Sequence, residues 1–267
     1  MTEQIQQEQE RPQAAAGPPV YVYGIVPADV EVSETAAGVG DPPAPVHLAR
    51  WAAVGALISD VDASQPLGRP EDLLAHQRLL DAVAGQTPVL PVRFGAVLTG
   101  VDSVIAELLK PNSDGFTAAL DEMDGRVQFV IKGRYAADTV LREVLAEDPE
   151  AQQLRVEIAS VGSPAAARDA SIRLGELVSA AITRKREADS HLVASLTAPV
   201  CVASSARPAS DELDAVHLAV LIDKDRQPDL EAALDDLVRD WLDRVELRLL
   251  GPMAPYDFVV AGRPEGG

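Results

Sequence analysis

The sequence is short of the side chains from which disulfides, metal sites and cationic surfaces are built. Its 267 residues include one cysteine and four histidines, so no intramolecular disulfide can form. Lysine and arginine number 23 against 42 aspartates and glutamates, which gives a formal net charge of −19. Nucleic acids and anionic membranes bind positive surfaces. The composition therefore argues against both as partners, and the single cysteine fits a reducing cytoplasm.

Signals for targeting and for membrane insertion are also missing. The N-terminal "MTEQIQQEQE" has no cationic stretch followed by an apolar one, which predicts no secretory signal. No run of 18 consecutive apolar residues occurs, so we predict no membrane-spanning helix. Residues 1–18 are mostly Gln, Glu, Ala and Pro and predict a flexible tail. The remaining chain, with 47% hydrophobic residues overall, is long enough to bury a core.

The motifs that bind phosphates or metals are absent from the sequence. Neither G-x-x-x-x-G-K-[ST] nor G-x-G-x-x-G occurs. His47, His76, His191 and His217 are isolated, without the spacing of metal ligands. Cys201 lies in the apolar run "PVCVAS", which favours a small buried side chain over a nucleophile. We therefore predict no enzyme, no cofactor and no metal site.

The first half predicts a small α+β domain over residues 19–124. The run "VYVYGIV" at 20–26 combines β-branched and aromatic residues, which predicts a strand buried on both faces. Residues 46–61 predict two short strands, and residues 88–98 predict another. Residues 69–86 predict a helix, because a proline stands at its first position and acidic residues follow in its first turn. Two short helices are predicted to complete this domain.

The second half, residues 125–267, predicts another α+β domain. It opens with a half-buried strand at 126–135, followed by a helix at 138–155 and a long amphipathic helix at about 164–196. Two strands, a helix and a last strand complete the order β-α-β-β-α-β of a ferredoxin-like unit. The long helix exceeds what this small sheet can cover, so part of it is predicted to pack on the other domain or on a partner. The apolar face of the last helix is predicted from Leu230, Leu234, Leu237 and Trp241.

Four separated segments carry a resemblance to a known family. They are "VYVYGIV", "LPVRFGAVL" after a helix bearing His76, "RVQFVIKGRY" and "GPMAPYDFV". In this order they resemble the gas vesicle protein GvpF/GvpL family over about residues 20–260. One departure is Met253, where the family usually has a tryptophan after Gly-Pro.

The resemblance implies a non-enzymatic accessory or minor structural protein of gas vesicle assembly, located at the gas vesicle in the cytoplasm. It implies binding to the small amphipathic shell subunit of the GvpA type and to other accessory proteins, which would prevent aggregation while a vesicle nucleus forms. A charged exterior would keep such a complex dissolved.

Arg93 lies in the middle of the apolar run "PVLPVRFGAVL". In a strand, Arg93 and Gly95 would point away from the face that Phe94 helps to build. A buried guanidinium needs a partner. We favour an ion pair with Glu71 or Asp72 that fixes the helix to the sheet, and a direct partner contact is the second interpretation.

Other residues have two interpretations each. Pro91 cannot donate to a strand ladder, which predicts an edge position or a bulge where a partner strand could add. For His76 we favour a satisfied buried side chain over a ligand, and for Tyr256 and Phe258 we favour packing over interface anchoring. The basic run "TRKRE" at 183–187 favours a solvated helix face over a docking patch. The candidate interface is Pro91, Arg93, Phe94, Gly95, Tyr256 and Phe258.

Two rival functions differ in class from an assembly factor. A ferredoxin-like regulatory module would bind a small metabolite, and it predicts a defined cavity together with a ligand-dependent shift in melting temperature. An enzyme with a spatially assembled acid pair would instead show a strongly raised carboxyl pKa in a cleft.

Overall fold

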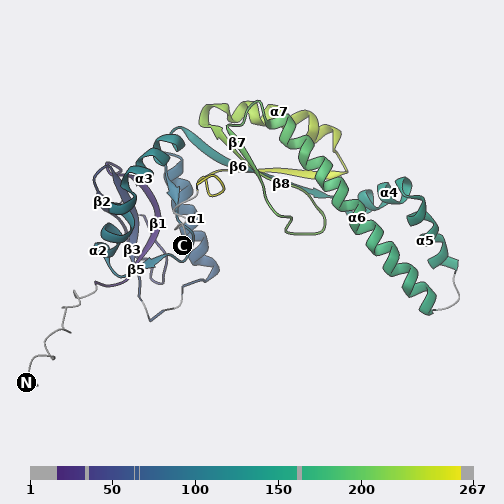
Figure 1. Ribbon diagram of the computed structural model, residues 1–267, viewed down its shortest axis with the longest axis horizontal. Helices are drawn as coiled ribbons and strands as arrows, with labels where there is room; N and C mark the ends of the chain where they lie inside the picture. The colour runs from purple at the N-terminus through teal and green to yellow at the C-terminus, as the bar shows by residue number, and fades with distance from the viewer. Residues whose placement is uncertain (1–16, 34–35, 63, 66, 161–163, 260–267) are drawn as a thin grey trace, which may run out of the picture. The chain divides into compact units, whose positions relative to one another are not determined.

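The chain forms two compact units in a computed structural model (Figure 1), with the division between Asp124 and Gly125. The described residues are 17–33, 36–62, 64–65, 67–160 and 164–259. The tail predicted over residues 1–18 lies outside these ranges except for its last two residues. Each unit is described by itself below. No helix among the described residues combines the length and the apolar composition needed to cross a membrane.

The first unit is built on one antiparallel sheet. Its strands are β1 Val20–Pro27, β2 Val46–Trp51, β3 Val54–Asp60, β4 Leu90–Pro91 and β5 Val97–Leu98. The strand order is β2-β3-β1-β4, and β5 also pairs with β1. Every residue of β1 before Pro27 is buried, which confirms the prediction of a strand buried on both faces.

The helices of the first unit are α1, α2, η1 and α3. Their bounds are α1 Pro70–Ala84, α2 Val101–Ser103, the π-helical η1 Val104–Leu109 and α3 Lys110–Met123. The prediction of two separate short helices after β5 is wrong, because α2, η1 and α3 follow one another without a break. Pro111 lies in the first turn of α3, directly after η1. Proline cannot donate a helical hydrogen bond, and the changed pairing of a π segment lets the helix continue past such a residue.

The run predicted as one strand over residues 88–98 is interrupted by a three-residue bulge. Before the bulge, Val92 N–H donates to the carbonyl of Tyr23, and after it Val22 N–H donates to the carbonyl of Ala96. One step along β1, from Tyr23 to Val22, thus corresponds to four steps along this run, from Val92 to Ala96. The three residues between Val92 and Ala96 have no backbone hydrogen-bond partner on β1. These three residues, Arg93, Phe94 and Gly95, are named the Arg93–Gly95 bulge. The predicted strand alternation through Arg93 is wrong, whereas the edge position with a bulge is confirmed.

The second unit is a four-stranded antiparallel sheet in the order β7-β8-β6-β9. Its strands are β6 Arg126–Tyr135, β7 Ala203–Ala206, β8 Asp214–Asp223 and β9 Val245–Met253. Its helices are α4 Ala137–Glu147, α5 Pro149–Ser160, α6 Pro164–Thr197, the 3-10 turn η2 Lys224–Arg226 and α7 Gln227–Asp240. Mixed helices and antiparallel sheets confirm the predicted α+β class. With α4, α5 and α6 counted as one helical layer, the order is the predicted β-α-β-β-α-β, while assignment to the ferredoxin-like fold stays a prediction.

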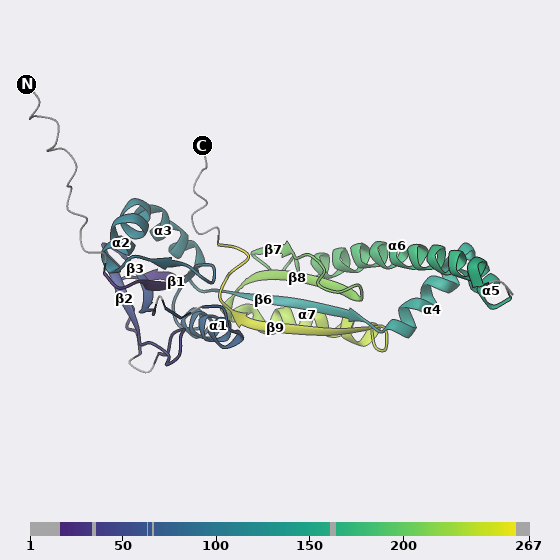
Figure 2. The same ribbon diagram turned by 90° about the horizontal axis from the view of Figure 1, so that it is seen from below.

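Helices α6 and α7 lie on one face of this sheet, and Figure 2 shows the sheet from its other side. The predicted apolar face of α7 is confirmed, since all four of its residues are buried in the core with β6 and β8. The single helix predicted over residues 138–155 is wrong. Asp148 ends α4 and its carboxylate accepts hydrogen bonds from the N–H groups of Glu150 and Ala151, so that α5 begins at Pro149. Helix α5 packs along α6, and this contact covers part of the long helix within its own unit.

Candidate functional site

The Arg93–Gly95 bulge rests on a cluster of four rings. Tyr21 and Tyr23 come from β1, His76 comes from α1, and Phe94 comes from the bulge itself. The ring centroids of Tyr21 and Tyr23 are 4.7 Å apart, and His76 lies 5.7 Å from each of them and 5.6 Å from Phe94. Ring pairs at these separations attract one another beyond simple burial. The cluster therefore joins two of the four segments that carry the family resemblance and the helix that bears His76.

Hydrogen bonds hold His76 in this cluster, and burial keeps its ring neutral. The N–H of Gly95 donates to the hydroxyl oxygen of Tyr21 at 3.0 Å, and that hydroxyl lies 2.9 Å from His76 Nδ1. Burial lowers the pKa of His76 to about 4, and the nearby Val92 backbone offsets only part of this effect. His76 is thus a neutral, buried side chain as predicted, but it is only partly satisfied, because its Nε2 has no hydrogen-bond partner among the described residues.

Arg93 itself is exposed and forms no ion pair with any residue that the structure describes. The predicted partner Asp72 is taken by Arg69, whose Nη2 lies 3.2 Å from its carboxylate, and the other predicted partner, Glu71, is exposed. The favoured ion-pair interpretation is therefore wrong. A bulge turns its extra residues away from the regular hydrogen-bond ladder, which explains why the Arg93 side chain is exposed to solvent.

Asp72 performs a different structural role, which the sequence analysis missed. Its carboxylate accepts hydrogen bonds from the backbone N–H groups of Gly40, Gly68 and Arg69, and it is 2% exposed. The Arg69 guanidinium lowers the pKa of Asp72 to about 2. An acidic residue in the first turn of a helix was a visible capping signal. The start of α1 and the loop around Gly40 are therefore held together by one buried carboxylate.

The C-terminal motif is fixed by a second polar cluster, in the second unit. Gln128 on β6 is fully buried, and its amide donates to Asp257 at 2.5 Å and accepts from the Asp257 N–H at 3.0 Å. Arg207, after β7, also donates to the Asp257 carboxylate, from Nε at 2.9 Å. Tyr256 and Phe258, the predicted packing or interface residues, are half-buried beside Asp257. The only sequence signal for this cluster was a glutamine inside an apolar strand.

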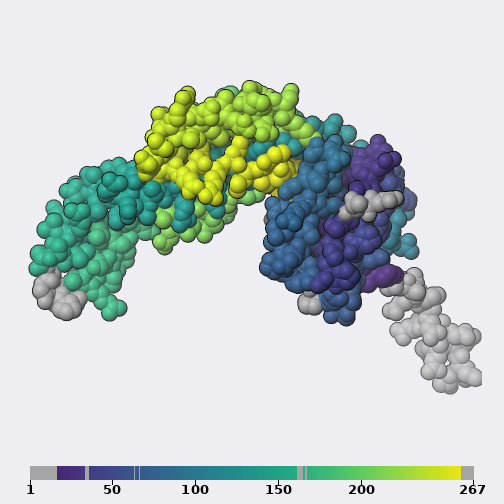
Figure 3. Space-filling model, turned by 180° about the vertical axis from the view of Figure 1, so that it is seen from behind, coloured from purple at the N-terminus to yellow at the C-terminus, as the bar shows by residue number. Residues whose placement is uncertain are grey.

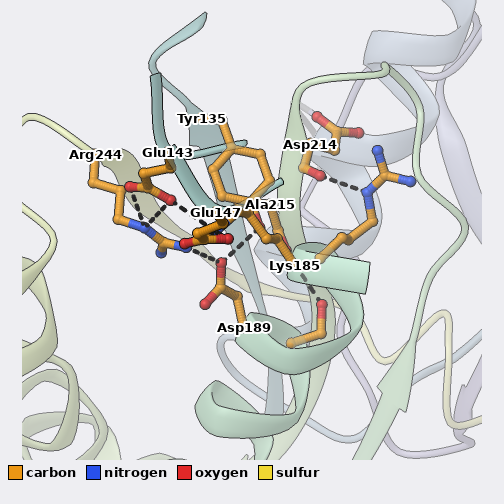
Figure 4. A network of polar contacts seen from close by, with 10 residues as sticks. Tyr135, Glu143, Glu147, Lys185, Asp189, Asp214, Ala215 and Arg244 are labelled. Atoms are coloured by element: carbon orange, nitrogen blue, oxygen red, sulfur yellow. Dashed lines mark hydrogen bonds and ion pairs between the residues drawn. The ribbon is translucent and has the colours of Figure 1, made fainter. Parts of the chain in front are cut away.

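A network of charged groups ties α4, α6 and the start of β9 together (Figure 4). The hydroxyl of Tyr135 donates to Asp189 at 2.6 Å, and Arg244 donates to the same carboxylate at 2.9 Å. Arg244 also pairs with Glu143 at 3.0 Å, and Lys185 Nζ lies 3.2 Å from Glu143. Burial, followed by the Asp189 carboxylate, raises the pKa of Tyr135. The network aligns the long helix with the sheet and contains no exposed reactive group.

The basic run at 183–187 belongs partly to this network. Lys185 is bound by Glu143 and Glu147, and Arg186 donates to the backbone carbonyls of Asp214 and Glu212. Of the predicted solvated face, Arg184 is exposed as expected, whereas Lys185 and Arg186 hold α6 to neighbouring elements.

The described residues offer no group of three His, Cys, Asp or Glu side chains placed to hold a metal ion. Burial raises the pKa of the Cys201 thiol, which keeps it protonated rather than nucleophilic. Taken together, these residues build two rigid anchors, and one of them presents an exposed guanidinium. Such an arrangement can bind a partner.

Comparison with known proteins gives concordant results. The family model described as gas vesicle synthesis protein GvpL/GvpF matches residues 19–260. Gas vesicle protein F of Streptomyces sp. (strain CB03234) is 32% identical over 243 residues, covering 90% of this chain and 98% of that protein. Gas vesicle protein L1 of Halobacterium salinarum is 26% identical, with 89% of each chain covered. The crystal structure of GvpF from Microcystis aeruginosa superposes with a TM-score of 0.72 at 22% identity, covering 90% of this chain and 98% of that one.

Proposed function

This chain belongs to the gas vesicle synthesis protein GvpL/GvpF family, and from this premise we propose that it is a non-enzymatic assembly factor. In this role it binds the small amphipathic shell subunit of the GvpA type, together with other accessory proteins, in the cytoplasm at the forming gas vesicle. Binding keeps the subunit from aggregating until a vesicle nucleus has formed.

The observation that carries this proposal is the rigid presentation of Arg93. The neighbouring residues on either side of it are fixed, because Val92 pairs with β1 and Phe94 packs in the ring cluster. The guanidinium has no ion pair among the described residues, so the fold does not use it. Because the backbone around Arg93 is already fixed, binding a partner has to order the side chain alone and not the segment that carries it. We therefore assign the Arg93–Gly95 bulge to the partner interface; Pro91, which precedes it on β4, is buried and would support the bulge rather than contact the partner.

The C-terminal pair is proposed as a second contact. Tyr256 and Phe258 are half-buried rings on a segment that Gln128 and Arg207 hold in place through Asp257. Aromatic side chains that are fixed at the base and partly exposed are frequent anchors of protein interfaces. The acidic surface of the chain, with a formal charge of −19, supports solubility of a complex that contains an amphipathic subunit.

The test is a sedimentation assay of the small shell subunit with the purified protein. We expect wild-type protein to keep the subunit in the supernatant and Arg93→Ala to lose this effect. Because Arg93 is exposed and makes no ion pair with the residues that the structure describes, its removal should change the free energy of unfolding by no more than about 0.5 kcal/mol. A urea titration of the variant checks that it is folded.

Arg78→Ala is the matched control, since Arg78 is another exposed arginine of the first unit, on α1. It should behave as wild type. Pelleting of the subunit in the presence of wild-type protein would contradict binding to the shell subunit. An Arg93→Ala variant that still protects the subunit would remove the bulge from the interface while leaving the binding function intact.

The metabolite-binding alternative stays a prediction. A cavity of about 450 Å³ lies beside α1, lined among others by Val30, Leu57, Leu79 and Val83. It belongs to the first unit, whereas the alternative predicts a site in the ferredoxin-like second domain.

A further inference from the structure

Strand β9 leaves one long edge of the second sheet open. It is the outermost strand, with β6 on its inner side (Figure 2). From Glu246 to Met253, the backbone groups on the outer side have no hydrogen-bond partner among the described residues. Figure 3 shows the yellow residues of the second unit, which include β9, at the molecular surface. Exposed edges of this kind readily pair with another strand.

The other sheet edges are shorter or partly covered. Strand β7 at the opposite edge has four residues, and β4 in the first unit has two. Strand β2 has six residues, but the N–H of Val46 donates to the carbonyl of Ala36 at 3.2 Å, and a further bridge joins Ala37 and Pro45. The nine residues of β9 are therefore the longest uncovered edge among the described residues.

The side chains of β9 alternate between two kinds. Val245, Leu247 and Leu249 pack against the core, while Glu246 and Arg248 point to the other face, with exposures of 62% and 67%. The two charged residues contact each other at 2.6 Å within the strand. On the open face of the sheet, an acidic and a basic side chain thus lie on either side of the core-facing Leu247.

We propose that β9 pairs with β9 of a second copy of this chain, antiparallel about a twofold axis at Leu247. In this register, the numbers of two residues that face each other add up to 494. Leu247 meets Leu247, Val245 meets Leu249, and Glu246 meets Arg248 in both directions. Over the five overlapping residues 245–249, every cross-strand pair is apolar with apolar or acidic with basic, which are the favourable combinations. A shared patch of this kind is typical of twofold dimers. The proposal is independent of shell-subunit binding.

Neighbouring registers lack this complementarity. An axis at Glu246 places two glutamates opposite each other, and an axis at Arg248 does the same with two arginines, which destabilises a strand pair. Within one copy, Arg248 already lies opposite Lys132 of β6. A glutamate of the second copy on the outer side of Arg248 offsets this repulsion between like charges. The net charge of −19 opposes association, and this repulsion is reduced at about 0.15 M salt, where the Debye length is about 8 Å.

Sedimentation velocity of the full chain over a concentration series tests the proposal. Wild-type protein should shift from monomer to dimer with concentration. Glu246→Arg and Arg248→Glu should each raise the dimer dissociation constant about tenfold, because each places like charges opposite one another at two symmetric positions. The double variant Glu246→Arg/Arg248→Glu should restore wild-type association. The single changes shift the net charge in opposite directions, so a general charge effect cannot explain a loss in both.

Two further measurements keep the outcome clear. Glu122→Arg, an exposed residue of α3, is the charge-matched control and should associate as wild type. In a Cys201→Ser background, Leu247→Cys should cross-link between copies under mild copper oxidation, because the two Cα atoms face each other. Leu249→Cys should not, since its counterpart lies four residues away along the strand, roughly 13 Å. Wild-type protein that stays monomeric throughout, or a double variant that fails to regain association, would overturn the proposal.

Discussion

At the scale of single residues, the protonation of His76 makes the free energy of unfolding of the first unit depend on pH. Its pKa is about 4 in the folded state, where burial disfavours the charged ring, against 6.5 as its ordinary value. Between these values the unfolded chain binds more protons than the folded chain, so acid favours unfolding. The stability that a neutral His76 contributes is fully present above about pH 6.5 and is lost as the pH falls toward about 4.

We therefore expect the free energy of unfolding of the first unit to fall by roughly 1 to 2 kcal/mol between about pH 7 and about pH 5. Urea titrations followed by Trp51 fluorescence in a Trp241→Phe background measure this change. The His76→Phe variant keeps a ring in the cluster and removes the titrating group, so its stability should depend much less on pH. The same pH dependence in both proteins would mean that another group is responsible.

At the scale of elements, the C-terminal segment after β9 is attached to the sheet by Asp257. This carboxylate is the shared partner of the buried Gln128 amide and of Arg207. Removing the hydrogen-bond partner of a buried amide lowers the free energy of unfolding by more than removing an exposed ion pair does. The fixed position of Tyr256 and Phe258 therefore depends on one side chain that lies between them in the sequence.

Asp257→Ala should lower the free energy of unfolding by roughly 2 kcal/mol and speed hydrogen exchange in the first residues of β6. Asp236→Ala is the control, because Asp236 is 85% exposed and pairs only with the exposed Arg239 among the described residues. It should change the stability by less than about 0.5 kcal/mol. Equal effects of the two substitutions would show that the Gln128 contact contributes little.

At the scale of the whole molecule, each unit has its own sheet and its own tryptophan. Trp51 ends β2 in the first unit, and Trp241 is buried in the core of the second. An uninterrupted core is the unit of cooperative unfolding, so the two units are expected to unfold in separate transitions.

Leu230→Ala tests this expectation, since Leu230 is fully buried in the second core. It should lower the stability reported by Trp241 by about 2 to 5 kcal/mol and leave the transition reported by Trp51 in place. Full-length Trp51→Phe and Trp241→Phe backgrounds isolate the two signals. A parallel shift of both transitions would show that the chain unfolds as one cooperative unit.

The sequence by itself determined the features that depend on neighbouring residues. The positions of strands β1 and β6 and the apolar face of α7 follow from local composition and periodicity, and the α+β class follows from their order. The half-buried character predicted for β6 is wrong, because residues 127–131 are buried on both faces of the sheet. The break at Asp148 is also encoded locally, because a capping aspartate followed by proline is a visible signal for the start of a helix. The prediction of one helix over residues 138–155 overlooked this signal.

Only the tertiary structure decided which polar groups meet. Asp257 and Gln128 are 129 residues apart in the sequence, and Arg244 and Glu143 are 101 apart. Local pattern carries no information about such pairs, because their energies arise only when the fold removes both groups from water. The same reason applies to Arg93. Its partner was predicted as a carboxylate on the preceding helix, Glu71 or Asp72. In the structure Arg69, three residues from Asp72, pairs with that carboxylate, and a bulge three residues long turns Arg93 outward.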